Sequence, residues 1–216
     1  MLVDKTTKAG DMIKYFIKNL QSFVGHKFRS KWQTDQLKYL IENLPTNECL
    51  VVHDFSENYR CTDRVEIQSN YFQRTEVSVH VSLIYRYAIL EVDGVSSTPE
   101  EINIICEHFH IISPDEKHDQ YFVHYVQKSI SEYLNSINYH VTVMHAFCDG
   151  CQCQYNSRNC FGNFAESVEE FGYSKIIRNF FESCHGKGPQ DAAGGLLKNQ
   201  ADMVVIRGKA EIRSAR

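Results

Sequence analysis

The sequence predicts an α/β fold in which helices cover a mixed β-sheet. Strand-like and helix-like patterns follow one another in a definite order: three strands in succession, then helix, strand, helix, strand and helix. Strands joined directly tend to pair antiparallel, whereas a helix between two strands returns the chain to a parallel neighbour. The 216 residues are 43% hydrophobic, which suffices for one substantial core. We therefore expect one sheet with three antiparallel strands followed by parallel strands, flanked by helices.

Residues 1–45 are expected to form a helical segment that packs on the core, and residues 46–216 to form the α/β domain. Apolar side chains recur at helical spacing from Asp11 to Leu44, and Pro45 ends the pattern. The stretch is divided by a basic segment made of His26, Lys27, Arg29 and Lys31. We expect an N-terminal helical pair joined by this basic turn, which is either a solvated loop or a phosphate contact.

The leading strands have distinct signatures. The run CLVVHDF is typical of a buried strand, and we expect it to end at Asp54. Apolar and polar residues alternate from Glu76 to Tyr87, and the stretch from Ile102 to Ile112 is rich in β-branched and aromatic residues. The later elements are expected to be a helix over 121–137, a strand over 140–149, a helix over 161–171, a strand over 175–181 and a helix after the glycine-rich turn at 185–195.

Charge and cysteine content exclude several classes of protein. The net charge of −4 argues against binding nucleic acid through a uniformly basic surface, so any DNA contact is expected to be local. No apolar run approaches the roughly 20 residues of a membrane-spanning helix. The first residues lack the apolar stretch of a secretory signal. We therefore expect an intracellular protein without membrane contact, whose eight cysteines are free thiols.

Three aspartates, Asp54, Asp149 and Asp191, form the candidate catalytic site. Asp54 and Asp149 each end a predicted buried strand, and the carboxyl ends of strands form the ligand crevice of an open α/β sheet. On neighbouring strands these carboxylates would repel each other unless a cation lay between them. Asp191 stands at the start of the last helix. Carboxylate oxygens suit Mg²⁺ or Mn²⁺, and three acids can hold two ions for phosphodiester chemistry. Taken singly, each aspartate could instead end a strand or cap a helix.

Residues close to the second aspartate offer other interpretations. A possible zinc site includes one Cys-x-x-Cys spacing and consists of Cys148, Cys151, Cys153 and Cys160. No second spaced pair accompanies it, so free thiols are the simpler interpretation. His53 and His145 could carry protons or support a metal ligand, but we expect both to pack on the other face of the sheet.

Four blocks in fixed order carry a family resemblance. They are VVHDFSENY, EIQSNYF, FCDGCQCQYNSRN and the segment from Ser183 to Lys198, which is similar to SHGKGPxDGxGGxxK. From about Lys31 to Lys198 the chain resembles the DDE-type transposases of animal DNA transposons. The resemblance implies a ribonuclease H-like catalytic domain with the three aspartates as metal ligands. It also implies that His185 and Lys187 lie near the scissile phosphate and that Lys198 belongs to the substrate-binding residues.

The resemblance implies a nuclear, Mg²⁺- or Mn²⁺-dependent nuclease that cleaves DNA and transfers 3′ ends, as in DNA transposition and integration. Transposon ends and target DNA would be its partners, and assembly on two DNA ends favours a homodimer. Two features favour a fragment or domesticated copy. Ala192 replaces the glycine usual after the third acid, and the chain ends at Arg216, shortly after that acid. The alternative function is an inactive DNA- or protein-binding module, and a zinc-stabilised interaction module is a third.

Overall fold

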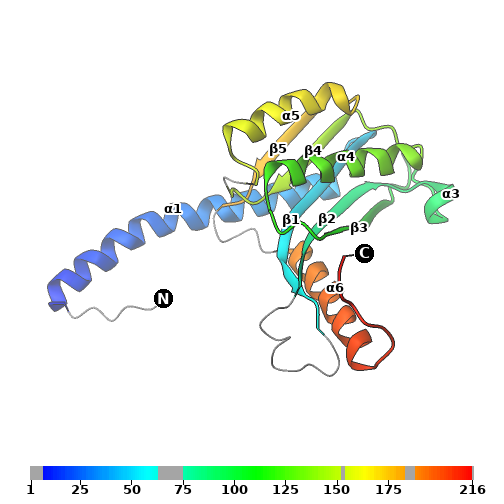
Figure 1. Ribbon diagram of the computed structural model, residues 1–216. Coiled ribbons are helices and arrows are strands. Elements are labelled where there is room, and N and C mark those ends of the chain that lie inside the picture. The colour runs from blue at the N-terminus through cyan, green and yellow to red at the C-terminus, as the bar shows by residue number, and fades with distance from the viewer. Residues whose placement is uncertain (1–6, 63–74, 152–153, 183–187, 216) are drawn as a thin grey trace.

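The computed structural model describes residues 7–62, 75–151, 154–182 and 188–215 (Figure 1). Its elements are α1 (Ala9–Glu42), β1 (Glu48–Arg60), β2 (Glu76–Tyr87), α3 (Leu90–Asp93), β3 (Ile104–Ser113), α4 (Gln120–Ser136), β4 (Val143–Cys148), α5 (Arg158–Glu170), β5 (Lys175–Phe180) and α6 (Pro189–Ile206). The strands and the helices α4 and α5 lie close to the positions that the sequence predicts, whereas the short helix α3 was not predicted. α6 begins at Pro189, inside the stretch predicted as a glycine-rich turn over 185–195, because Pro189 and the capping carboxylate of Asp191 start a helix there. No helix in the described ranges combines the length and apolarity needed to cross a bilayer.

One five-stranded sheet organises the chain, with the strand order β3-β2-β1-β4-β5. β1 pairs antiparallel with β2, and β2 pairs antiparallel with β3. β4 lies parallel to β1, and β5 lies parallel to β4. The predicted α/β fold, with three antiparallel strands followed by parallel strands and flanking helices, is confirmed. The two parallel pairings occur where α4 and α5 intervene in the chain, as crossover connections require.

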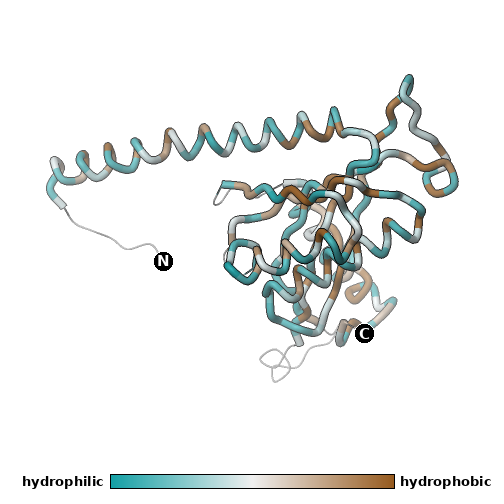
Figure 2. The backbone as a smooth tube through the Cα atoms, turned by 90° about the horizontal axis from the view of Figure 1, so that it is seen from above, coloured by the Kyte–Doolittle hydropathy of each residue, from teal (hydrophilic) through white to brown (hydrophobic). Residues whose placement is uncertain are grey.

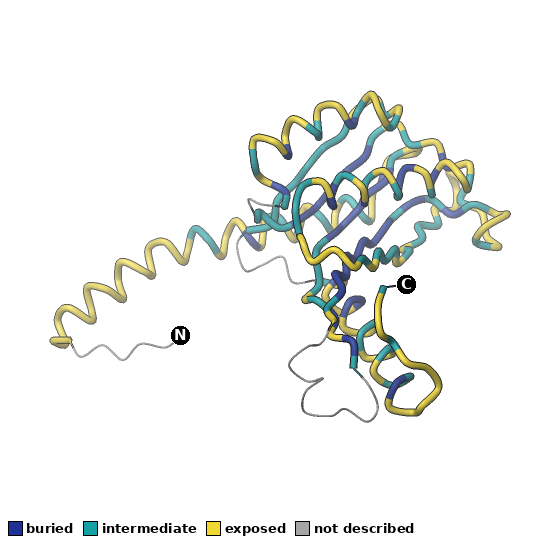
Figure 3. Tube along the Cα trace, viewed as in Figure 1, coloured by how far each residue is buried: buried dark blue, intermediate teal, exposed yellow. Residues whose placement is uncertain are grey.

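β1 is the central strand, and its first half is buried on both faces. Leu50 and Val52 face one apolar cluster, whereas Cys49 and Val51 face the other. A strand covered on both sides needs apolar residues at successive positions, which explains the uninterrupted run in the sequence. Figure 3 shows this buried strand in the middle of the sheet.

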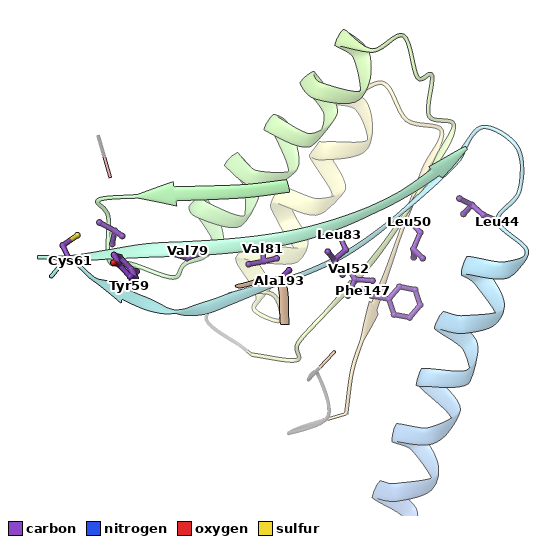
Figure 4. Packing of buried hydrophobic residues seen from close by; sticks show 11 residues of the cluster. Leu44, Leu50, Val52, Tyr59, Cys61, Val79, Val81, Leu83, Phe147 and Ala193 are labelled. Carbon is purple, nitrogen blue, oxygen red and sulfur yellow. The ribbon is translucent and has the colours of Figure 1, made fainter. Parts of the chain in front are cut away.

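The two faces of the sheet are covered by different helices (Figure 1). On one face, α4 packs a stripe at helical spacing that consists of Phe122, Val126, Ile130 and Leu134. Asp119 starts this helix because its carboxylate accepts the backbone N–H groups of Tyr121 and Phe122. On the other face lie α6 and the end of α1. Figure 4 shows Ala193 of α6 beside Val81 and, further along, Leu44 beside Leu50.

The expected N-terminal helical pair is wrong, because α1 is one continuous helix of 34 residues. The basic segment lies inside it. His26 and Arg29 are three residues apart, so both side chains reach Glu182 after β5 from one side of the helix. This segment contains no proline, and its lysines and arginine are good helix formers.

Only the last part of α1 packs on the core, through residues that include Leu37, Leu40 and Ile41. The N-terminal part projects from the sheet, and its side chains are exposed (Figure 3). Figure 2 shows apolar residues along this projecting part. The exposed large side chains include Phe16, Phe23 and Trp32.

β1 also differs from the prediction at its end. We expected the strand to stop at Asp54, but it continues to Arg60. The parallel partner β4 ends its pairing at His53, whereas β2 continues alongside β1 as far as Arg60. An ion pair between Arg60 and Glu76 lies at the end of this two-stranded extension. At Asp54 the pairing of β1 with β4 has ended, whereas β1 itself continues.

A glycine allows α6 to approach the sheet closely. A Cβ at Gly194 would lie 3.1 Å from Cβ of Ser56 and 3.2 Å from a methyl carbon of Val81. Both neighbours belong to paired strands, which cannot move apart without losing ladder hydrogen bonds. The next residue, Gly195, has nothing within 4 Å of the corresponding position. Gly194 is thus the contact point that sets how far the start of α6 stands from β1 and β2.

This contact predicts opposite effects for two neighbouring substitutions. Gly194→Ala should lower the free energy of unfolding by about 1–3 kcal/mol, since the added methyl group overpacks the contact. Gly195→Ala should raise it by up to about 1 kcal/mol, because alanine favours an exposed helix. Urea denaturation followed by circular dichroism measures both. Equal stability of the two variants would show that the close approach is not a constraint.

Candidate metal centre

β1 and β4 bring two of the predicted acids together. The parallel register pairs Val52 with Phe147 and His53 with Cys148, so Asp54 and Asp149 are the next residues along their strands. Val52 and Phe147 both belong to the apolar cluster under α6. Because side chains alternate along a strand, the two aspartates two positions later share that face. Neighbouring strands are about 4.8 Å apart, which places the carboxylates side by side.

The third acid approaches from α6. Asp191 occupies the third position of this helix, three residues before the contact at Gly194. Gly194 touches Val81, and Val81 is the register partner of Asp54. The first turn of α6 is therefore seated over the strand position at which Asp54 stands. Asp54 and Asp149 are half-buried, and Asp191 is exposed.

The pKa of Asp54 reflects the proximity of the other two acids. Burial, the largest cause, and the charges of Asp149 and Asp191 together raise the pKa of Asp54 from its ordinary value of 3.8 to about 7, against the lowering effect of the hydrogen bond from the N–H of Phe55. A like charge disfavours ionisation only over a short range in a partly buried site. The three acids, which are far apart in the sequence, thus form one electrostatic group.

Each carboxylate is also engaged locally. Asp54 accepts the N–H of Phe55 at 2.8 Å, Asp149 that of Gly150 at 2.6 Å, and Asp191 that of Gly188 at 2.8 Å. Within the described ranges these bonds use one oxygen of each carboxylate. No three histidine, cysteine, aspartate or glutamate side chains in those ranges are arranged closely enough to hold a single ion. The acids are electrostatically coupled, but their carboxylates are not gathered around one point.

The donor set still fits a hard divalent cation. No positively charged side chain is among the causes that set the pKa of Asp54. Carboxylates that lie together without such compensation are typical of a site that a cation stabilises. Carboxylate oxygens are the ligands that Mg²⁺ and Mn²⁺ prefer. The residues that could hold such an ion are Asp54, Asp149 and Asp191.

The predicted substrate-binding residues have different outcomes. His185 and Lys187 lie outside the described residues. The ammonium group of Lys198 donates a hydrogen bond to the carbonyl oxygen of Glu57 at 3.3 Å. Lys198 is thereby held over β1, beyond Asp54 along the strand. Ser56, against which α6 packs at Gly194, was not among the predicted site residues, and the paired glycines in the last block were the available signal.

The two histidines beside the aspartates have different positions. His53 packs on the face opposite Asp54, with its ring 5.2 Å from that of Tyr155 and 5.5 Å from that of His80. Burial, together with the charge of Arg178, lowers the pKa of His53 to about 3, so the ring is neutral near pH 7. The prediction for His53 is confirmed. For His145 it is wrong.

The position of His145 follows from the alternation along β4. His145 is two residues before Phe147, so it lies on the same face as Asp149. It stands at the opposite end of the strand, where its Nε2 contacts the carboxylate of Glu48. This partner explains why a histidine is retained at a largely buried position, and the distance along the strand separates it from the acids.

The cysteines near Asp149 behave as ordinary thiols. Cys148 is buried on the opposite face beside Tyr155, and Cys160 is buried at the start of α5. The thiol of Cys160 donates to the carbonyl of Gln154 at 3.3 Å and accepts from the hydroxyl of Ser157 at 3.0 Å. Cys49, Cys61, Cys106, Cys148 and Cys160 are free thiols, and Cys153 lies outside the described residues. The described thiols do not form a zinc-like group.

The raised pKa of Asp54 predicts a pH-dependent stability. Between about pH 4 and pH 7 the folded protein keeps a proton that the unfolded chain releases, so the free energy of unfolding falls as the pH rises through this range. Asp54→Asn should remove this loss. In EDTA at pH 8 its Tm should exceed that of the wild type by several degrees, at about 2–4 °C per kcal/mol for a chain of this size.

At pH 3, below the ordinary pKa of 3.8, the two proteins should melt together, because Asp54 is then protonated in both the folded and the unfolded state. The control is Asp35→Asn on the exposed surface of α1, where the carboxylate pairs with Lys31 and no like charge is relieved. Differential scanning fluorimetry measures all three proteins. A lower Tm of Asp54→Asn at pH 8 would show that the carboxylate is not under electrostatic stress.

Comparison with known proteins gives one match. Residues 33–216 match the family described as a domain of unknown function, DUF8701. No curated protein and no solved structure matches the chain. The matched region begins within α1 and includes the whole sheet, the three aspartates and α6. The chain belongs to the DUF8701 family.

Proposed function

We propose that this chain is the catalytic core of a transposon-derived enzyme that cleaves DNA phosphodiesters and transfers strands with the help of Mg²⁺ or Mn²⁺. The observation that carries the proposal is that Asp54, Asp149 and Asp191 lie on one face of the sheet and influence one another electrostatically. They come from a central strand, its parallel neighbour and the first turn of a helix seated on the same face. The raised pKa of Asp54 indicates that this group is short of positive charge.

The strand order supports a ribonuclease H-like identity for the fold. Three antiparallel strands continue into two parallel ones, with the order β3-β2-β1-β4-β5, which is the arrangement that the resemblance to DDE-type transposases implies. The acids also stand where that resemblance expects them: on the first strand, after the fourth strand and at the start of the last helix. Fold alone does not determine function, so the weight of the proposal rests on the acids.

Asp54 and Asp149 would hold the metal ion between the two central strands, and Asp191 would complete the site from α6. When bound, such an ion lowers the pKa of an attacking water or 3′-hydroxyl and stabilises the leaving oxygen of the phosphodiester. The carboxylates would turn from their local N–H partners toward the ion. Relief of the repulsion felt by Asp54 would favour that movement.

DNA would be bound locally, since the chain as a whole carries a net charge of −4. Lys198 has three N–H donors and, within the described residues, uses one for Glu57, which leaves donors to offer a phosphate. His185 and Lys187 are proposed to contact the scissile phosphate, as the resemblance implies. Transposon ends and target DNA would be the substrates, with a homodimer and a nuclear location as further expectations.

A second function is an inactive module that binds DNA or protein. Two observations favour it. The described acids are not gathered around one ion, and Ala192 replaces the glycine that the transposase pattern has after the third acid. Metal binding and DNA cleavage distinguish the two functions, because an inactive module would need neither.

We expect Mn²⁺ to stabilise the protein. An ion that binds only the folded state raises the free energy of unfolding by about 2.7 kcal/mol at a hundred times its Kd. The Tm at pH 7.5 should therefore rise with Mn²⁺ concentration in the wild type and in Asp35→Asn, but not in Asp149→Asn. A rise of equal size in all three proteins would place the binding elsewhere.

We also expect Mn²⁺-dependent nicking of supercoiled plasmid DNA. Asp149→Asn should reduce it about 100-fold or more, since even partners that only support a metal ligand contribute about 10–100-fold. Asp35→Asn should retain full activity, because Asp35 lies on α1 and is paired with Lys31. Agarose gel electrophoresis of time courses measures the rates. Absence of nicking together with absence of Mn²⁺ stabilisation would leave the binding module as the function.

A further inference from the structure

β3 is an edge strand of the sheet, and one of its faces presents two histidines. Phe109 and Ile111 point toward the cluster under α4. The alternate residues, His108 and His110, therefore point to the other face. His108 is exposed, and His110 is half-buried. Neither histidine is among the predicted site residues, and the proposed function does not use them.

The spacing of the two rings suits a shared ligand. Residues two apart on a strand are about 6.6–7 Å apart at Cα and project side by side. The ring centroids of His108 and His110 are 6.1 Å apart, with the ring planes at 81°. Two imidazoles on one ion, each with a metal–nitrogen distance of about 2.0–2.1 Å, have centroids roughly 4.5–5.3 Å apart at octahedral or tetrahedral ligand angles. The observed separation exceeds this range by about 1 Å, a difference that rotation of the two side chains can close without movement of the backbone.

The rings are also available as ligands. Within the described part of the chain neither histidine has a hydrogen-bond partner, and the Nδ1 atom of His110 is buried without one. Burial, assisted by the neighbouring His108, lowers the pKa of His110, so its ring is neutral near pH 7. A neutral imidazole is the form that binds metal. A pair of histidines that chelates an ion is expected to have ring nitrogens without other partners, as Nδ1 of His110 has beside His108.

We propose that His108 and His110 form a binding site for a divalent transition-metal ion such as Ni²⁺, Cu²⁺ or Zn²⁺. Imidazole nitrogen favours these ions, whereas carboxylate oxygens favour Mg²⁺ and Mn²⁺. The pair supplies two ligands, and the remaining positions stay open to water or to an outside donor. Cys106 lies on the same face, but its thiol is hydrogen-bonded to Tyr85. It also lies four residues along the strand from His110, too far to share one ion with it.

This site is separate from the candidate metal centre. His110 pairs with Val81, and Val81 pairs with Asp54, so the two sites lie two strands, or about 10 Å, apart on the same face. The first turns of α6 contact Val81, between them. The inference therefore does not depend on the proposed function, and the chemistry of the ion distinguishes the sites.

Isothermal titration of the full chain with Ni²⁺, in a buffer that does not chelate metal, tests the proposal. We expect the wild type to bind one more equivalent than His108→Asn at concentrations that saturate the wild-type site. Loss of one imidazole should weaken that step at least about tenfold, since the second ligand acts at a high effective concentration. His108 is exposed, so its replacement should leave the fold intact, and His110→Gln provides a second variant.

Two controls separate this site from others. His140→Asn, the first control, removes an exposed histidine away from this strand and should bind Ni²⁺ like the wild type. The second control is a hundredfold excess of Mg²⁺, which favours carboxylate sites and should not displace Ni²⁺ from the histidine pair. Unchanged Ni²⁺ binding by His108→Asn and His110→Gln would overturn the proposal, as would an equal loss in His140→Asn.

Discussion

The parallel pairing of β1 with β4 is the constraint on which the candidate metal centre depends. Its register joins His53 to Cys148 and then stops, so Asp54 and Asp149 stand side by side where the ladder ends. β1 nevertheless continues, because β2 extends alongside it to Arg60. The central strand therefore holds the site in the middle of a rigid surface, between the end of α1 and the start of α6. Sites on paired strands are positioned more accurately than sites on loops.

The close approach of α6 turns this pair of acids into a group of three. Gly194 lets the helix rest on Ser56 and Val81, and one helical turn earlier Asp191 meets the charges of the strand acids. Packing energy from the apolar contacts of α6 thus offsets the electrostatic cost of gathering like charges. Such a site is less stable without a cation than with one, which links the proposed activity to measurable changes in stability.

The two faces of the sheet have different chemical characters. The face under α4 holds His53, His80 and Tyr155 in a buried cluster, where burial keeps both imidazoles neutral. The other face carries the acids at its centre and the histidine pair on its edge strand. Hard oxygen donors and borderline nitrogen donors are thereby separated by strand position, so two kinds of cation could be bound without competition.

The sequence by itself determined the order of the elements and the directions of the strands, and it predicted which acids stand at the strand ends and at the start of α6. Apolar periodicity is local, and the helices between the later strands impose parallel pairing. It did not determine that α1 is a single helix, because a basic segment is compatible with a turn until Glu182 is seen to pair with His26 and Arg29. Only the tertiary structure decided the register that aligns Asp54 with Asp149, the seat of α6 at Gly194 and the face on which His145 lies. These depend on contacts between residues far apart in the chain, and such contacts leave no periodic signal in the sequence.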